Sequence, residues 1–341
     1  MAFPIYLETW DTQAHFLKTI ALNDRLAQHV VKLSLGRNHH VSKGDAVIER
    51  SIGEAMKKLV NLKKLNLYAQ SSNYIVSAHL DSVPFSLTRL VLSWRKPNPT
   101  DPDPPLLSIL QAHPTLEELF LSHPSGCLPP DLISALIAEQ DGLSGSEKGI
   151  LCPEPKRFRV CDEDLRLFLP NRRIECVASW GCGAERILET DQHVSTWLNP
   201  ILIPSYHHIR ILEVWANPDQ GYIWFLPTIA PYLTSLTHLC ILDGIRKLGQ
   251  DDYDLTSTLG QVQTLQSLTM SSVDEDDITM ADVQEAVQFV RGVLPDIQEI
   301  IVGLDEEGMV YYRYVKEEGM QRTFVDHGMA FGPYNRWVHD L

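Results

Sequence analysis

A repeated pattern of apolar positions runs along most of the chain. In the stretch LKKLNL, residues 62–67, an apolar residue is followed by two more, three and five positions later. The same spacing recurs in VVKLSL at residue 30, LTRLVL at 87, LEELFL at 116, IRILEV at 209, LTHLCI at 236, LQSLTM at 265 and IQEIIV at 297. Because side chains alternate between the two faces of a strand, the last two apolar positions predict a strand with one buried face. KRFRV at 156–160 and RRIECV at 172–177 are degenerate copies.

Segments with a helical period lie between these strands. In residues 45–60, DAVIERSIGEAMKKLV, the apolar residues fall roughly on one face of a helix. Residues 131–139 begin with aspartate, a favoured N-cap, and continue with an apolar face. Residues 276–295 are acidic at their start and end at a proline, as a helix often does. The pattern therefore predicts a unit of strand, turn and helix that recurs every 25–32 residues where the copies are clear.

Such a unit cannot bury its apolar face alone, so neighbouring units are expected to stack. We predict an α/β, leucine-rich-repeat-like solenoid over residues 1–304, with parallel strands on the concave side and helices on the convex side. Its first 29 residues would be an N-terminal cap or remnant. In residues 305–341, the segments 309–315 and 320–325 flank a turn at 316–319 and predict a C-terminal β-hairpin cap. Residues 331–338 would belong to the same cap, which packs on the last repeat.

The composition is that of an ordinary globular protein, with 44% hydrophobic and 21% charged residues. The net charge of −15 argues against nucleic acid and membrane surfaces as partners, because both bind cationic surfaces. The N-terminus has no signal-peptide pattern, and the most apolar stretch, residues 222–233, is too short to span a bilayer. The six cysteines are scattered without a Cys-x-x-Cys pair, which favours reduced thiols. We expect an intracellular protein, cytoplasmic or nuclear.

The sequence offers no catalytic motif. It contains no GxSxG, GxxxxGK[ST], GxGxxG or HExxH segment. The histidine doublets at 39–40 and 207–208 are poor metal sites, because adjacent residues on a strand point to opposite faces. Cys176 and Cys182 lack partners at zinc-binding spacing, and the acidic run at 273–277 is best explained as a solvated start of a helix. We expect no enzymatic activity, no metal and no cofactor.

Residues between the buried positions of each strand are expected to point to the concave side. On the first six strands these positions are rich in basic residues, namely Lys32, Lys64, Arg89, Arg157, Arg159 and Arg173. Asn66 and Tyr68 share the strand of Lys64. Later strands bring Ile211, Trp215 and Leu242 to the same side. Arginine and lysine bind carboxylates and phosphates, and exposed aromatic residues often anchor interfaces.

Two interpretations of the basic stripe stay open. In the first, it binds a protein or peptide with an acidic or phosphorylated segment beside an apolar one. The candidates are then Lys64, Tyr68, Arg89, Phe120, Arg157, Arg159, Arg173 and Trp215. In the second, the cations only keep the sheet soluble, or they pair with Glu118, Glu175 and Glu213 across strands.

Three segments carry a resemblance to a known family: LKTIALNDRLAQHVVKLSLG at 17–36, HPTLEELFLS at 113–122 and KRFRVCDEDLRLFLPNRRIECVAS at 156–179. In their pattern and order, the chain resembles fungal, basidiomycete-type F-box proteins with degenerate leucine-rich repeats. The resemblance covers roughly residues 16–315. It implies a noncatalytic substrate-binding part of a ubiquitin-ligase subunit.

The resemblance does not extend to the F-box itself. In that family the F-box is a helical module that precedes the repeats and docks on a Skp-type adaptor. The opening segment MAFPIYLETWDTQ contains no Leu-Pro and acidic-leucine run of the kind that begins an F-box. Binding to a Skp-type adaptor is therefore expected only if an F-box exists upstream. Two functions stay open: an F-box-like ubiquitin-ligase substrate adaptor, and a stand-alone leucine-rich-repeat scaffold with no ubiquitin-ligase link.

Overall fold

A computed structural model of the chain describes residues 10–36, 45–69, 75, 78–94, 103–122, 128–140, 151, 155–170, 172–180, 202–215, 226–242, 255–272, 280–304 and 310–324. The chain forms two compact units, Met1–Arg173 (unit 1) and Ile174–Leu341 (unit 2). Each unit is an α/β arrangement with a mostly parallel sheet, in which strands follow one another in chain order. This part of the fold prediction is confirmed.

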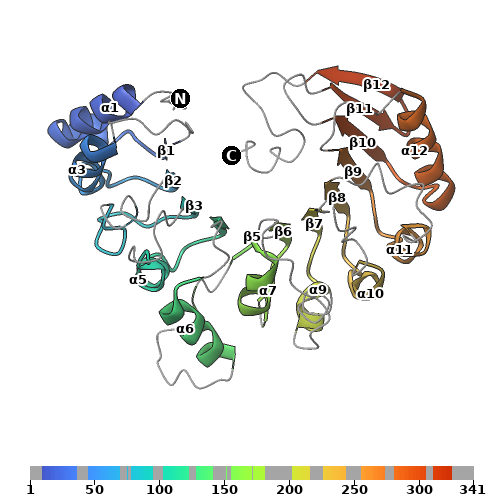
Figure 1. The fold of residues 1–341 in the computed structure, drawn as a ribbon, viewed down its shortest axis with the longest axis horizontal. Helices are drawn as coiled ribbons and strands as arrows, with labels where there is room; N and C mark the ends of the chain where they lie inside the picture. The colour runs from blue at the N-terminus through green and yellow to red at the C-terminus, as the bar shows by residue number, and fades with distance from the viewer. Residues whose placement is uncertain are drawn as a thin grey trace. The chain divides into compact units, whose positions relative to one another are not determined.

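Unit 1 alternates strands with helices. In chain order its described elements are α1 (Trp10–Leu22), α2 (Asp24–Ala27), β1 (Lys32–Leu35), α3 (Asp45–Met56), β2 (Lys64–Ala69), β3 (Arg89–Trp94), α5 (Leu106–Ala112), β4 (Glu118–Ser122), α6 (Pro130–Gln140), β5 (Arg157–Cys161) and α7 (Asp162–Phe168). Each strand is parallel to the next. Figure 1 shows the helices of this unit along one side of its strands. The opposite face carries no helix among the described residues, and we call it the open face of unit 1.

Unit 2 repeats this arrangement and ends in a hairpin. Its described elements are β6 (Cys176–Trp180), α9 (Ile203–Tyr206), β7 (Ile211–Trp215), α10 (Leu226–Ile229), the 3-10 turn η2 (Ala230–Tyr232), β8 (His238–Leu242), α11 (Leu255–Gln261), β9 (Ser267–Ser272), α12 (Met280–Val293), β10 (Glu299–Leu304), β11 (Val310–Val315) and β12 (Gly319–Phe324). Strands β6 to β10 are parallel, and β11 and β12 are antiparallel.

The core of each unit is a ladder of apolar side chains held in register from strand to strand. In unit 1 the ladder contains Leu33, Leu65, Leu90, Leu119 and Phe158, none of which is more than 3% exposed. In unit 2 the equivalent ladder contains Val177, Leu212, Leu239, Leu268 and Ile300. The apolar residue that opens a copy of the pattern, such as Leu62, is buried in the turn before the strand, except in the first copy, where Val30 is half-buried. The repeated leucines therefore pack in two places, the first in the turn before the strand and the others in the core beneath the sheet.

A backbone contact recurs at the start of most strands. The carbonyl of Val31 accepts hydrogen bonds from the N–H groups of Lys63 (2.9 Å) and Lys64 (3.1 Å) in the next repeat. The same double acceptance occurs at the carbonyls of Lys63, Thr88 and Glu117 in unit 1, and of Glu175, Arg210, Thr237 and Gln266 in unit 2. This contact fixes where each strand begins relative to the one before it.

The predicted helices at 45–60, 131–139 and 276–295 are confirmed as α3, α6 and α12, with shifted ends. The prediction for the strand at 172–177 is wrong. Strand β6 begins at Cys176, and Val177 pairs with core residue Leu212. Arg173 and Glu175 precede the strand and are exposed. The true copy of the pattern is IECVAS at 174–179, in which a serine occupies the second strand position and hides the period. Arg173, Glu175 and Val177 therefore do not stand together on the open side of a strand.

The predicted C-terminal hairpin is confirmed. Strand β11 pairs with β10 on one side and with β12 on the other. The buried ring of Tyr314 on β11 lies against α12, where the guanidinium carbon of Arg291 is 4.7 Å from the ring centroid. Lys316 in the turn forms an ion pair of 3.0 Å with Asp296. The proposed further part of the cap, residues 331–338, lies outside the described residues.

The sequence pattern did not predict helix α1, which covers the first repeat. Its buried residues Leu17 and Ile20 face the interior of unit 1. Gln13 on the same helix accepts a 3.0 Å hydrogen bond from the N–H of Gly36, just after β1. Gly36 has φ +89°, and an added Cβ would lie 2.0 Å from the carbonyl oxygen of Tyr68. Only glycine fits this junction between α1, β1 and β2.

We predict that Gly36→Ala destabilises the protein by about 2 kcal/mol or more, because the new methyl group meets the backbone at a strained φ. Gly260→Ala is the matched control, since α11 leaves open space around its Cβ position. That change should stabilise the protein by about 0.5–1 kcal/mol. Chemical denaturation of both variants measures the difference. Equal stability of the two variants would contradict this account of the junction.

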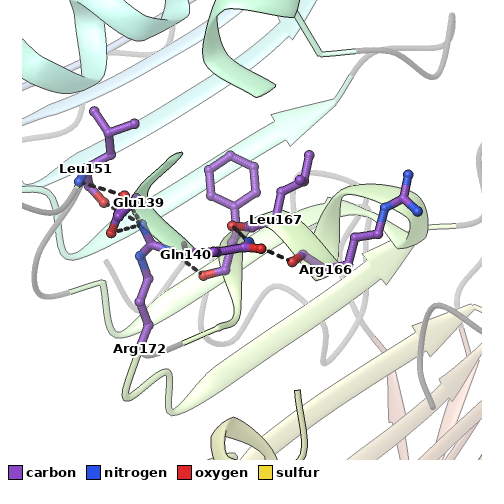
Figure 2. A network of polar contacts seen from close by, with 7 residues as sticks. Glu139, Gln140, Leu151, Arg166, Leu167 and Arg172 are labelled. Carbon is purple, nitrogen blue, oxygen red and sulfur yellow. Dashed lines mark hydrogen bonds and ion pairs between the residues drawn. The ribbon is translucent and has the colours of Figure 1, made fainter. Parts of the chain in front are cut away.

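A buried ion pair joins α6 to the end of α7 in unit 1 (Figure 2). Arg172, whose side chain is 3% exposed, donates to both carboxylate oxygens of Glu139 at 2.9 and 3.0 Å. It also donates to the carbonyls of Phe168 and Leu151. Beside it, the amide of Gln140 donates to two carbonyls at the end of α7. The network satisfies backbone acceptors that a helix end leaves open.

Replacing Arg172 by methionine should lower the free energy of unfolding by about 3–5 kcal/mol, because Glu139 would lose its buried partner. Arg166→Met is the control. Figure 2 shows the side chain of Arg166 directed away from the ion pair, and only its carbonyl takes part in the network. Thermal and urea denaturation should therefore separate the two variants clearly. An Arg172→Met protein as stable as Arg166→Met would show that the ion pair does not hold this end of unit 1.

Candidate functional site

The register of unit 1 brings its charged open-face residues into one line. Residues Lys32, Lys64, Arg89, Glu118 and Arg157 pair from β1 to β5, and we call them the first row. Adjacent strands are about 4.8 Å apart, so each charge acts on its neighbours. The row contains four cations and one carboxylate in a chain of net charge −15. The sequence pattern predicted these cations and, in the second interpretation, their pairing with Glu118 across strands, and the register places Glu118 in the same row.

Glu118 bridges the two arginines of this row. Its carboxylate oxygens lie 3.5 Å from Nη1 of Arg89 and 3.7 Å from Nη1 of Arg157. The side chain of Arg89 is 1% exposed and that of Arg157 is 30% exposed. The bridge therefore connects a buried cation to one that solvent or a ligand can reach.

Burial works against both charges of the Arg89–Glu118 pair. It lowers the pKa of Arg89, although the attraction of Glu118 acts in the opposite direction. Burial also raises the pKa of Glu118, although the charges of Arg89 and Arg157 act to lower it. The guanidinium still stays protonated, because its unperturbed pKa is far above neutrality. Both directions mean that the charged pair costs folding free energy, so stability alone does not explain its presence.

Arg89 and Phe120, two candidates from the sequence, lie in the site but beneath its surface. The guanidinium carbon of Arg89 is 5.2 Å from the centroid of the Phe120 ring, within cation–π range. Phe120 is 4% exposed and Arg89 is 1% exposed. Arg89 and Phe120 are therefore positioning residues. They hold Glu118 in place, and Glu118 in turn contacts Arg157.

Lys64, Tyr68, Arg157 and Arg159 keep part of their side chains accessible on the open face. Arg157 and Arg159 are two positions apart on β5, so both project to the same side, about 7 Å apart along the strand. Lys64, Arg157 and Arg159 also have polar or electrostatic interactions within the protein, and Tyr68 interacts electrostatically with Arg89. These four are the sequence-predicted candidates that a partner can touch in unit 1.

Asn66 lies on β2 between Lys64 and Tyr68, at an open-face position that the sequence pattern predicted together with these two residues. It is 8% exposed, and its Nδ2 donates to the hydroxyl of Ser34 at 2.8 Å. Its Oδ1 is buried and accepts no hydrogen bond. The unsatisfied Oδ1 could not be predicted from the sequence, because it depends on which neighbouring groups bind the amide of Asn66.

The corresponding face of unit 2 carries different chemistry. Glu299 accepts hydrogen bonds from the hydroxyl of Ser267 at 3.0 Å and from Nε of Arg313 at 2.6 Å. Partial burial lowers the pKa of His238 in the same row, although Glu299 acts to raise it. Candidate Trp215 is the last residue of β7, and its side chain, like that of Leu242, lies outside the described part. Arg173 is exposed ahead of β6 and joins neither face.

One buried histidine elsewhere in unit 1 has a structural explanation. Nε2 of His113 lies 2.9 Å from the carbonyl of Leu80, and its Nδ1 accepts from the N–H of Leu87 at 3.4 Å. Both contacts are satisfied by a neutral ring that donates from Nε2. Burial lowers the pKa of His113, which favours that neutral form. The ring stacks on Phe85 and closes the turn before β3.

Comparison with models of known protein families finds no match, and comparison with curated proteins finds none either. Among the described helices, none combines the length and apolar character that a bilayer crossing requires. The described His, Cys, Asp and Glu side chains form no group of three suited to a metal ion. The open face of unit 1 is therefore the feature of the described residues from which we infer a function.

We predict that Arg89→Met lowers the free energy of unfolding by about 3 kcal/mol, because it leaves the Glu118 carboxylate buried without its nearest cation. Adding Glu118→Leu should recover most of that loss or exceed it, since an apolar pair carries no desolvation cost. Urea denaturation of the wild type, the single variant and the double variant gives the comparison. A double variant less stable than Arg89→Met would show that the ion pair stabilises the fold.

Proposed function

We propose that this protein is a noncatalytic recognition module that binds an acidic segment of a partner protein on the open face of unit 1. The observation that carries the proposal is the first row, in which the register aligns four cations around a single carboxylate. A cationic row on an acidic chain gives a local attraction for carboxylates or phosphates, whereas the rest of the surface repels them. The strands that present it are fixed by their turn carbonyls, so the row is rigid before binding.

The cost of the buried pair supports the same proposal. Burial lowers the pKa of Arg89 and raises that of Glu118, so it disfavours the charged form of each. Groups that cost stability and persist are common at functional sites, where they hold other groups in place. Here the group held in place is Arg157, whose planar fork suits a bidentate carboxylate or phosphate.

The proposed architecture is a leucine-rich-repeat-like solenoid, with strands on the concave side and helices on the convex side. Supporting it are the leucine ladder, the recurring turn carbonyl and the terminal hairpin. Together with the resemblance to fungal F-box proteins, this makes the substrate-binding part of a ubiquitin-ligase subunit the proposed origin of the module. Adaptor docking is assigned to none of its residues. The absence of a catalytic motif in the sequence agrees with a binding role.

Charge reversal tests the proposal directly. The probes are fluorescein-labelled hexaglutamate and, as a neutral control, hexaserine. Wild-type protein should bind hexaglutamate in preference, and added salt should weaken the binding because it screens the charges. The double variant Arg157→Glu/Arg159→Glu should bind at least about tenfold more weakly, since each lost charge-assisted contact is worth about 1.5 kcal/mol or more.

A matched variant separates the site from net charge. Lys57→Glu/Arg166→Glu makes the same change in net charge at two exposed residues of unit 1, one after α3 and one on α7. It should bind hexaglutamate like the wild type, apart from a small nonspecific loss. Equal affinities of the two double variants would contradict an acidic-segment site on the open face. Fluorescence anisotropy gives both affinities.

A further inference from the structure

The second row of unit 1 has an ordered sequence of chemical groups. It consists of Ser34, Asn66, Val91, Phe120 and Arg159, in register from β1 to β5. From Asn66 to Arg159 the row passes from a buried amide, over two apolar residues, to a cation. Three strand spacings separate the two ends, which is about 14 Å. An extended peptide covers that distance with about four residues.

The amide of Asn66 identifies the group that would lie at one end. Its Nδ2 is satisfied by Ser34, while its buried Oδ1 accepts no hydrogen bond. A main-chain N–H of a peptide would supply the donor that this oxygen lacks. A buried polar atom without a partner costs free energy that such a ligand would recover.

The other end of the row suits an anion. Arg157 and Arg159 project to the same side of β5, next to Glu118. Glu118 lies 3.7 Å from Arg157 and repels an incoming anion, whereas the arginines attract it. Both effects grow with the charge of the anion, so electrostatics alone does not choose between a carboxylate and a phosphate. A carboxylate is the simpler occupant, because aspartate and glutamate carry it without any modification of the peptide.

We propose that an extended peptide crosses β2 to β5 on the open face of unit 1, with a main-chain amide group on Asn66 and a carboxylate side chain at Arg157 and Arg159. The proposal rests on the proposed function and specifies its ligand. The peptide places a small or apolar residue over half-buried Val91 and passes above buried Phe120. Its recognition element is an acidic residue about four positions from the main-chain group that Asn66 binds.

A peptide series with one glutamate tests this arrangement. The probe is an acetylated, amidated nonapeptide of serine, valine and threonine with a single glutamate near one end. Each member of the series carries one N-methylated main-chain nitrogen, which removes one N–H donor. For the wild type, methylation about four residues from the glutamate should weaken binding about threefold to tenfold, and methylation elsewhere should have less effect. A flat series would overturn the assignment to Asn66.

Protein variants complete the test. Asn66→Ala should bind the unmodified peptide about threefold to tenfold more weakly and should lose the dependence on methyl position. Ser34→Ala is the control, because it removes the protein partner of the amide but leaves the amide itself. It should keep the position dependence. If Asn66→Ala does not fold, the methylation series on the wild type still decides the question.

The outcomes separate this inference from the proposed function. If Arg157→Glu/Arg159→Glu abolishes binding while Asn66→Ala and methylation change nothing, the acidic-segment site stands and the Asn66 contact is wrong. If no acidic peptide binds, both proposals fail. A peptide with phosphoserine in place of glutamate tests the choice of anion, and binding no tighter than that of the parent would support a carboxylate. Tighter binding of the phosphopeptide would overturn the choice of a carboxylate.

Discussion

A recurring backbone contact aligns neighbouring parallel strands within each unit of this protein. In most described repeats, the carbonyl at the end of the turn accepts two N–H groups from the start of the next repeat, as that of Val31 does from Lys63 and Lys64. The contact needs no particular side chain, so it survives in repeats whose sequences have diverged. A slip of one residue would move every leucine of a strand to the wrong face. Turn carbonyl and leucine ladder therefore enforce the same register.

The function proposed for unit 1 is a consequence of that register. Because each strand begins at an equivalent point, side chains at equivalent positions form rows across the sheet. In the first row, the charges of Lys64, Arg89 and Arg157 reinforce one another around Glu118. Burial makes part of this row costly, as the pKa directions of Arg89 and Glu118 show. The apolar ladder on the helix side of the sheet stabilises the fold and offsets the free energy that the buried charges of the open face cost.

Elements marked by a regular spacing of apolar residues could be predicted from the sequence. Features that depend on contacts between different strands could not. Strands with two leucines, the helices between them and the terminal hairpin could be predicted, because their patterns are local. Strand β6 could not be placed correctly, because Ser179 occupies an apolar position of the pattern. The basic face was predicted by alternation alone. The burial of Arg89 and the unsatisfied amide of Asn66 depend on contacts across strands, which no single segment contains.

The turn carbonyls hold the strands of unit 1 in one register. Residue-resolved amide hydrogen exchange tests it most directly at the four pairs that begin β2 to β5, namely 63–64, 88–89, 117–118 and 156–157. The account predicts that these amides exchange only through the same cooperative opening as the strand amides that follow them. Exchange of these pairs as fast as that of exposed loop amides, with the strands still protected, would contradict it.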